Sequence, residues 1–420
     1  MRSFHRVLFI IPILILVDLY VLKGLAGLLK DRKPSVRKPI LWVFIIFSLL
    51  IISGIFWFYL SYEQAPDEPE RFERLMWYLG FWLVQFGVKF FYIFFELAYD
   101  IRYLIMRFRP KKKFKEPLPA EDSVSSRRDF IRQVGIIAAA LPFIGIIHGI
   151  GWGRFRFTVH HSEISFKNLP PAFDGIRIVQ LSDAHLGSFF GKKDKLEEVV
   201  EIVNEIKPDL LLFTGDMVNN FSAEMNGYTD LWSRMEAPMG KFSVLGNHDY
   251  GDYSDWPSPE KKRNNLMGII RHQQAMGFRV LLNENLPLEI NGQRIYLSGA
   301  EHWGLPPFKQ YGDLKKTMTG IPEDAFTILM AHNPDQWTHG VIGDKRIGLT
   351  LSGHTHGFQI GIEVGNIKIS PSQLLYKQWA GLYQEGDQYI YVNRGLGCLS
   401  FPGRVGIWPE ITLLELKRQL

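Results

Sequence analysis

The sequence predicts an α/β domain, a sandwich of two mixed β-sheets flanked by helices, that follows an all-α transmembrane region. Before Gly153 the chain consists mainly of long apolar runs rich in Phe, Trp, Ile and Leu. After Gly153, short apolar runs alternate with polar, amphipathic stretches, as they do where strands pack against helices. A length of 420 residues is enough for both parts.

Residues 1–110 are predicted to form three transmembrane helices. Residues 7–29, 40–60 and 76–99 each approach the roughly 20 apolar residues that cross a bilayer as a helix. The alternative, buried helices of a soluble core, rarely gives such lengths without turn signals. Lys89 is the one charge near the centre of a segment. Charges at that depth usually face the bundle interior, and some serve transport.

The loops between these segments alternate in charge. Residues 30–38 and 102–128 are basic, whereas residues 63–73 are acidic. Since Lys and Arg stay on the cytoplasmic side, the basic loops are predicted to lie inside. The net charge of +5 is modest and its basic residues cluster beside the apolar segments, so it indicates membrane topology and not nucleic-acid binding. The single cysteine, Cys398, excludes an internal disulfide framework and a thiolate metal cluster.

Residues 111–153 are predicted to contain a basic cytoplasmic linker, a paired-arginine motif and a fourth apolar helix. Residues 125–132, with Arg127 and Arg128, precede a moderately apolar stretch at 134–150. This resembles a twin-arginine export signal, which would make the export machinery a partner; an ordinary fourth helix with basic flanks is the alternative. Both place the residues after Gly153 on the extracytoplasmic side of the cell membrane. Since no small-residue cleavage site follows, the span is expected to remain as an anchor.

Residues 154–420 show the pattern of the α/β domain. Strands are predicted at residues 175–182, 209–214, 242–245, 327–330, 347–351, 389–392 and 411–416. Helices are predicted at residues 193–206 and near residues 260–276 and 309–319.

Polar clusters follow several of these strands directly. Their members are Asp183 and His185; Asp216; Asn247, His248 and Asp249; His332 and Asn333; and His354 and His356. The carboxyl ends of strands are where open α/β sheets bind ligands. Asp183 and His185 alternate as in a strand, and so do His354 and His356, so each pair is expected to point to one side. Imidazole with carboxylate favours Mn, Fe, Zn or Co.

Each cluster alone has a simpler interpretation. An isolated Asp216 is typical of a turn, and a lone His332 is more often a core or surface residue. The ordered set of clusters favours a metal site instead. His302 follows a probable strand and is a candidate to line the cleft. His160, His161, His272 and His339 carry no motif and are interpreted as structural.

The five clusters resemble the calcineurin-like metallophosphoesterase superfamily, whose ordered pattern is D-x-H, G-D, G-N-H-D/E, H and G-H-x-H. The match covers roughly residues 155–420 and is most similar to the membrane-associated YkuE/YaeI-like branch. The resemblance implies a calcineurin-like four-layer fold and two divalent metal ions, Mn, Fe or Zn. It implies that one ion is held by Asp183, His185 and His356, that the other is held by Asn247, His332 and His354, and that Asp216 bridges them.

The resemblance also implies hydrolysis of a phosphoester, of the phosphodiesterase or pyrophosphatase type, by a metal-bridging hydroxide. His248 would stabilise the transition state and protonate the leaving group, and Asp249 would orient its imidazole. Arg394 is expected either to contact a substrate phosphate or to form a structural salt bridge.

Aromatic residues favour a lipid-linked substrate, with core packing as the alternative. Phe189 and Phe190 lie near the first ligand pair, and Phe358 replaces a glycine common in relatives. Two other functions remain open: a cytoplasmic-facing lipid-precursor pyrophosphatase of the UDP-diacylglucosamine type, and a non-enzymatic membrane scaffold with a decayed hydrolase domain.

Overall fold

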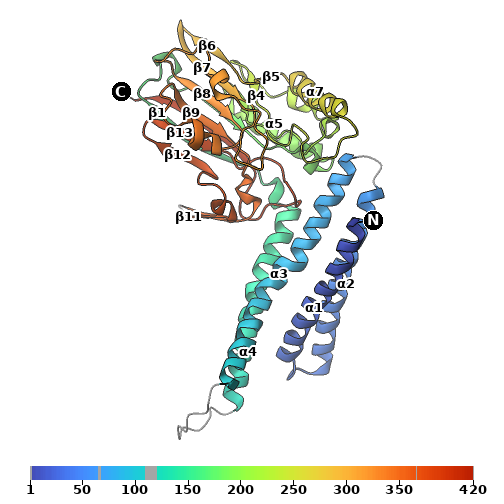
Figure 1. Ribbon diagram of the computed structural model, residues 1–420. Coiled ribbons are helices and arrows are strands. Elements are labelled where there is room, and N and C mark those ends of the chain that lie inside the picture. Colours follow the sequence, from blue (N-terminus) through green and yellow to red (C-terminus); the bar gives the residue numbers. More distant parts are fainter. Residues whose placement is uncertain (1, 65–67, 109–120, 366, 420) are drawn as a thin grey trace. The chain divides into compact units, whose positions relative to one another are not determined.

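The computed structural model describes residues 2–64, 68–108, 121–365 and 367–419 (Figure 1). The chain divides into two compact units. One comprises residues 1–65 and 74–148, and the other comprises Pro66–Glu73 and Gly149–Leu420. The basic linker expected at residues 111–120 lies outside the described residues.

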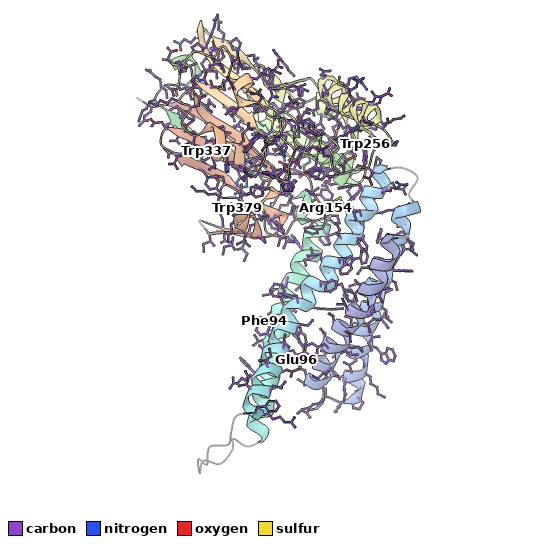
Figure 2. The ribbon with its side chains drawn as sticks, in the orientation of Figure 1. Phe94, Glu96, Arg154, Trp256, Trp337 and Trp379 are labelled. Atoms are coloured by element: carbon purple, nitrogen blue, oxygen red, sulfur yellow. The ribbon has the colours of Figure 1, made fainter. Side chains whose placement is uncertain are left out.

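The first unit is built from four long helices: α1 Arg2–Leu28, α2 Pro34–Gln64, α3 Glu68–Phe108 and α4 Glu121–Gly151. Each is long and apolar enough to cross a membrane, over Ile11–Leu28, Pro34–Ser61, Pro69–Arg102 and Gln133–Gly151. Large apolar side chains such as Val43, Phe94 and Leu141 are more than 60% exposed; Phe94 is labelled in Figure 2. Helices that expose apolar side chains in this way require a lipid surrounding. The twin-arginine signal, at the start of α4, remains a prediction.

Polar side chains of the helical unit meet in its interior. Lys89 is buried and pairs with Asp18, and its ammonium also donates to Ser48 Oγ at 2.9 Å and Gln85 Oε1 at 2.7 Å. A charge at membrane depth requires such compensation because hydrocarbon cannot solvate it. The cluster joins α1, α2 and α3. Lys89 therefore has a structural role in the packing of these helices.

The second unit contains two six-stranded mixed sheets. The first has the order β1-β14-β2-β3-β4-β5 and the second β12-β13-β9-β8-β7-β6. Their bounds are Thr158–Phe166 (β1), Glu410–Arg418 (β14), Arg177–Leu181 (β2), Leu210–Phe213 (β3), Lys241–Ser243 (β4), Phe278–Val280 (β5), Gly381–Glu385 (β12), Gln388–Val392 (β13), Ile347–Ser352 (β9), Thr327–Ala331 (β8), Gln293–Ala300 (β7) and Glu284–Ile290 (β6). Strands β2 to β5 are parallel, as are β7, β8, β9 and β13, whereas β6, β12 and β14 introduce antiparallel pairs. A small hairpin, β10 (Ile362–Val364) with β11 (Ile367–Ile369), stands apart from both sheets.

The two sheets face one another across an apolar core. Ile178 and Leu212 of the first sheet meet Leu297 and Leu351 of the second in one buried cluster. On the outer face of the first sheet lie α5 (Lys193–Ile206), α6 (Thr229–Ser233) and α7 (Pro259–Ala275) (Figure 1). Trp337 fills the outer face of the second sheet, near the one-turn helix α8 (Leu314–Thr317) (Figure 2). The predicted four-layer sandwich is confirmed.

The strongest periodic signals located their elements well. Helix α5 has the predicted bounds and buries Leu196, Val199, Val200 and Val203 on one face. The prediction of a helix near residues 309–319 was too long. Only Leu314–Thr317, which follows the N-cap Asp313, is helical. Strands β1, β5, β6, β10, β11 and β12 had not been predicted, whereas β7 is the strand expected before His302.

Candidate metal centre

The sequence-predicted ligands all lie in loops that follow parallel strands. Loops after β2, β3 and β4 of the first sheet and after β8 and β9 of the second carry them. The loops are bonded to one another, since Asp183 N donates to Gly215 O at 2.9 Å and His354 N donates to Asp183 Oδ2 at 3.0 Å. Two sheets packed face to face therefore bring together residues as far apart in sequence as Asp183 and His356.

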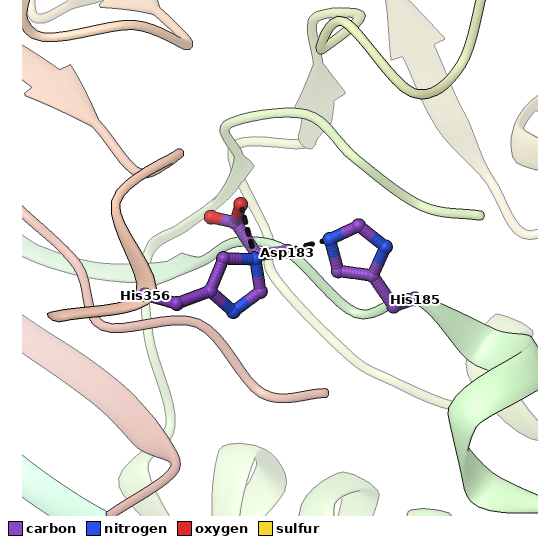
Figure 3. Close-up of side chains that lie close together, drawn as sticks. All are labelled: Asp183, His185 and His356. Carbon is purple, nitrogen blue, oxygen red and sulfur yellow. Dashed lines mark hydrogen bonds and ion pairs between the residues drawn. The ribbon is translucent and has the colours of Figure 1, made fainter. Parts of the chain in front are cut away.

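One group of ligand atoms comes from Asp183, His185 and His356, which are all buried (Figure 3). His356 Nε2 lies 3.2 Å from Asp183 Oδ1 and 3.0 Å from His185 Nε2. Burial, and then the neighbouring His356, lower the pKa of His185 well below its ordinary value. The His185 ring is therefore neutral at pH 7 and can offer a lone pair.

A second group comprises Asp216, His332 and His354. His332 Nε2 lies 3.1 Å from Asp216 Oδ2 and 3.3 Å from His354 Nδ1. Asp216 Oδ2 is also 3.7 Å from His185 Nε2, which belongs to the first group. Asp216 thus lies between the two groups, as a bridging carboxylate would.

Unpaired atoms test whether these residues fit metal ions. Asn247 Oδ1 is buried and has no hydrogen-bond partner among the described residues, whereas its amide Nδ2 donates to Tyr253 Oη at 2.9 Å. A buried acceptor without a donor costs free energy unless a cation or another donor satisfies it. Carboxylates, neutral imidazoles and an amide oxygen are a donor set suited to divalent metals. The residues present fit such ions.

The backbone of this site corrects the strand-like alternation expected from the sequence. Strands β2 and β9 end at Leu181 and Ser352, before the ligands. Asp183, His185, Asp216, His354 and His356 all have left-handed backbones, with φ of 49°, 40°, 59°, 70° and 50°. Non-glycine residues rarely adopt this conformation, and when they do it is often at functional sites. Tight turns, not strand alternation, direct these side chains inward.

Two glycines allow the loops to approach the carboxylates. A Cβ on Gly353 would lie 2.1 Å from Asp183 Oδ2, and one on Gly246 would lie 2.1 Å from Asp216 Oδ1. Any side chain there would displace a ligand, so glycine is required at both positions.

The expected pairing of Asp249 with His248 is absent from the structure. The Asp249 carboxylate instead accepts backbone N–H bonds from Asp216, Met217 and Gly246, each at 2.9 Å. Burial and the negative charge of Asp216 raise the pKa of Asp249 to about 7. Asp249 fixes the turn that carries Asp216, because its short side chain points into that loop and away from the imidazole.

His248 is oriented by a backbone carbonyl. Its Nδ1 donates to Asn219 O at 2.7 Å, which leaves Nε2 for another partner. The His248 and His185 ring centroids are 4.9 Å apart, so His248 lies beside the first group of ligands.

The other ring nitrogens of three of the candidate histidines, His332, His354 and His356, are held by partners that the sequence did not reveal. His332 Nδ1 donates to Thr214 O at 2.7 Å, and His354 Nε2 lies 2.9 Å from Tyr376 Oη. The buried guanidinium of Arg404 donates to His356 Nδ1 at 3.2 Å. Such partners fix ring orientation at metal sites. No motif in the sequence marks Tyr376 or Arg404.

The other candidate residues have separate positions. Arg394 is buried in salt bridges to Glu410 and Glu363, which supports the structural alternative and not a phosphate contact. His302 is buried with its ring centroid 5.7 Å from that of His332, so it borders the site. Phe189 is buried in the core, which supports the alternative of core packing over an exposed aromatic surface.

Comparison with known proteins identifies the family. The sequence model described as "Probable Calcineurin-like phosphoesterase, transmembrane domain" matches residues 2–154, and "Calcineurin-like phosphoesterase" matches residues 176–358. The uncharacterised metallophosphoesterase YkuE of Bacillus subtilis is 35% identical over 305 residues, covering 70% of this chain and 98% of YkuE. Phosphodiesterase YaeI of Escherichia coli is 28% identical, covering 69% of this chain and 99% of YaeI.

A further relative is named for a lipid substrate. The UDP-2,3-diacylglucosamine pyrophosphatase LpxG of Chlamydia trachomatis is 28% identical, over 55% of this chain and 81% of LpxG. These similarities agree with the clustered candidate ligands. The chain therefore belongs to the calcineurin-like metallophosphoesterase family and is a metal-dependent phosphoesterase with a transmembrane region.

Proposed function

We propose that the chain is a membrane-anchored dimetal phosphohydrolase of the phosphodiesterase or pyrophosphatase type that acts on a lipid-linked phosphoester. The observation that carries the dimetal part is the position of Asp216 between two buried groups of ligand atoms. Asp183, His185 and His356 would hold one ion, and Asn247, His332 and His354 would hold the other. Mn, Fe and Zn all suit these donors.

The residues around the candidate ligands would have distinct catalytic roles. When bound, two divalent ions supply acidified water and neutralise charge on the phosphoryl oxygens. Because Asn219 fixes its Nδ1, His248 would use Nε2 to contact the phosphoryl group and protonate the leaving oxygen. Asp249 holds the Asp216 turn by accepting backbone N–H bonds from Asp216 and Met217 at 2.9 Å and from Val218 at 3.3 Å, which would keep the bridging carboxylate in place.

The lipid-linked class is supported by the apolar spans and by the name of LpxG. The basic loops at residues 30–38 and 102–128 support a catalytic domain on the extracytoplasmic side. Fusing a reporter after Leu420 tests that side. Periplasm-type alkaline phosphatase activity is expected, whereas a fluorescent cytoplasmic reporter would support the cytoplasmic-facing pyrophosphatase instead.

The dimetal proposal is tested by hydrolysis of bis(p-nitrophenyl) phosphate with added Mn. Asp216→Asn removes the shared charge with little change in shape, so the Mn-stimulated rate should fall at least 100-fold, in line with the loss of a key electrostatic group. Asp387→Asn is a matched control, because Asp387 is an exposed residue in the turn between β12 and β13. Unaltered activity of Asp216→Asn, or no metal stimulation of the wild type by Mn, Fe or Zn, would reject the proposal.

A further inference from the structure

The hairpin β10–β11 and the segments on either side of it expose an unusual set of large apolar side chains. Their exposed fractions are 49% for Phe358, 57% for Ile362, 69% for Val364, 59% for Ile367, 51% for Ile369, 83% for Leu374 and 68% for Leu375. These residues are called the apolar patch below. Soluble surfaces seldom gather apolar side chains in this way unless the patch binds something.

The hairpin register explains why its apolar side chains share a face. Ile362 pairs with Ile369 and Val364 with Ile367, whereas Glu363 pairs with Lys368 between them. Since side chains of a strand alternate between faces, the four apolar residues lie on one face and the charged pair lies on the other. One face of the hairpin is therefore entirely apolar.

The charged face fastens the hairpin to the catalytic domain. Glu363 accepts from the buried Arg394 at 2.6 Å and 3.0 Å, and Lys368 Nζ lies 3.6 Å from Glu363 Oε1. An isolated two-stranded hairpin is marginally stable, so this ion pair with a buried guanidinium holds it in position. The apolar face is left facing outward.

The base of the hairpin is linked to the end of the fourth apolar span through Arg404 and Val405. Gly361 N donates to Val405 O at 2.9 Å, and Arg404 N donates to Gly149 O at 3.2 Å. The span Gln133–Gly151 ends two residues after Gly149. The exposed Trp152 follows, and Trp is enriched where chains leave a bilayer. The apolar patch thus begins close to the residues that end this span.

The same segment reaches the metal centre. Leu374 and Leu375 directly precede Tyr376, whose hydroxyl lies 2.9 Å from His354 Nε2. Phe358 lies two residues after His356. Tyr376 packs against the buried Trp379 and Ile407, which tie this segment to the domain. The patch, His354 and His356 are therefore parts of one continuous segment.

We propose that the apolar patch inserts into the interface of the lipid bilayer that holds the fourth span, and that lipid-borne phosphoesters pass along it to the metal centre. The occupant of the patch is the bilayer itself. The patch is apolar, and its base is linked through Val405 and Arg404 to the end of a membrane span. The delivery of substrate rests on the proposed function, but contact with the bilayer does not.

Contact with the bilayer is tested on the full chain in nanodiscs, in a Cys398→Ser background. Fluorescent labels attached through Val364→Cys and Leu374→Cys should be quenched by doxyl-labelled lipids several-fold more than a label attached through Asn291→Cys. Asn291 is exposed in the turn between β6 and β7, at the edge of the second sheet farthest from β12. Equal quenching at the three positions would overturn the proposal. Label-to-label proximity between two chains, without lipid quenching, would assign the patch to a second copy and also overturn it.

Substrate delivery is tested by comparing two substrates. The double variant Val364→Asp/Leu374→Asp should hydrolyse a diacylglycerol p-nitrophenyl phosphate in vesicles at least tenfold more slowly, with unchanged hydrolysis of soluble bis(p-nitrophenyl) phosphate. Asn291→Asp, the control, should leave both rates unchanged. Equal losses on both substrates would show a structural role and overturn delivery. A wild type inactive on both substrates would instead reject the proposed function, and the labels would still decide membrane contact.

Discussion

Replacement of Asn247 by Ala separates metal binding from folding. The Asn247 side chain makes one hydrogen bond, from Nδ2 to the half-exposed Tyr253, and its buried Oδ1 has no partner among the described residues. Loss of that bond costs about 1 kcal/mol, whereas removal of an unsatisfied buried acceptor recovers about 1–3 kcal/mol. Without metal, the free energy of unfolding of the catalytic domain should therefore change by less than about 2 kcal/mol.

With metal, Asn247→Ala should have a much larger effect. An ion at 100 times its Kd stabilises the folded state by about 2.7 kcal/mol. Partners that merely orient ligands are worth about 10–100-fold in affinity, so loss of a ligand should raise Kd at least about 100-fold. The same ion concentration then stabilises the variant by only about 0.4 kcal/mol. Asn247→Ala should thus lose about 2.3 kcal/mol of Mn-dependent stabilisation.

Hydrogen exchange of the β8 and β9 amides, with and without Mn, measures both quantities in the full chain. Asn265→Ala is the matched control, because Asn265 is also buried but both ends of its amide are bonded, to Ser222 N and Asn220 O at 2.8 Å each. Its loss should cost about 2–4 kcal/mol regardless of Mn. If Asn247→Ala keeps the full Mn-dependent protection, or costs as much as Asn265→Ala without Mn, Asn247 is not a ligand.

Two further predictions concern other buried charges. Burial alone would lower the pKa of His332, but the Asp216 and Asp183 carboxylates outweigh it and raise that pKa to about 9 in the metal-free protein. A metal must displace this proton, so the affinity for Mn should rise about tenfold from pH 7 to pH 8, and binding should release about one proton. Calorimetry of Mn binding in two buffers measures this proton release. A result without proton release would contradict the prediction. In the helical unit, Lys89→Met leaves Asp18 without its cation and should destabilise by about 3–5 kcal/mol, whereas Asp18→Asn/Lys89→Met should recover most of the loss. Thermal unfolding in detergent measures both variants, and equal stabilities would refute the pairing.

Local patterns predicted a large part of the fold because they depend on neighbours along the chain. The spacing of Leu196, Val199, Val200 and Val203 was sufficient to place α5. The hairpin β6–β7 was missed although its turn, Asn291-Gly292, has the positive φ angles of 50° and 74° that this dipeptide favours. That signal was present in the sequence and could have been used.

The roles of residues around the metal centre were less predictable. Asp249 lies next to His248 in sequence, yet its carboxylate binds the Asp216 turn across 33 residues. Tyr376 and Arg404 reach ligand histidines from segments with no recognisable motif. Such partners are set by which loops the packed sheets bring together, and sequence distance does not encode this.

The sequence by itself determined the apolar spans, the α/β class and the ordered set of ligand residues, because hydrophobic periodicity and residue chemistry are local properties. Only the tertiary structure decided that Asp216 lies between two groups of ligands and that the face of β10–β11 is apolar and exposed. Both features depend on the packing of the two sheets and on strand register, which join residues far apart in the chain. The candidate metal-binding residues could be read from the sequence, but their geometry required the fold.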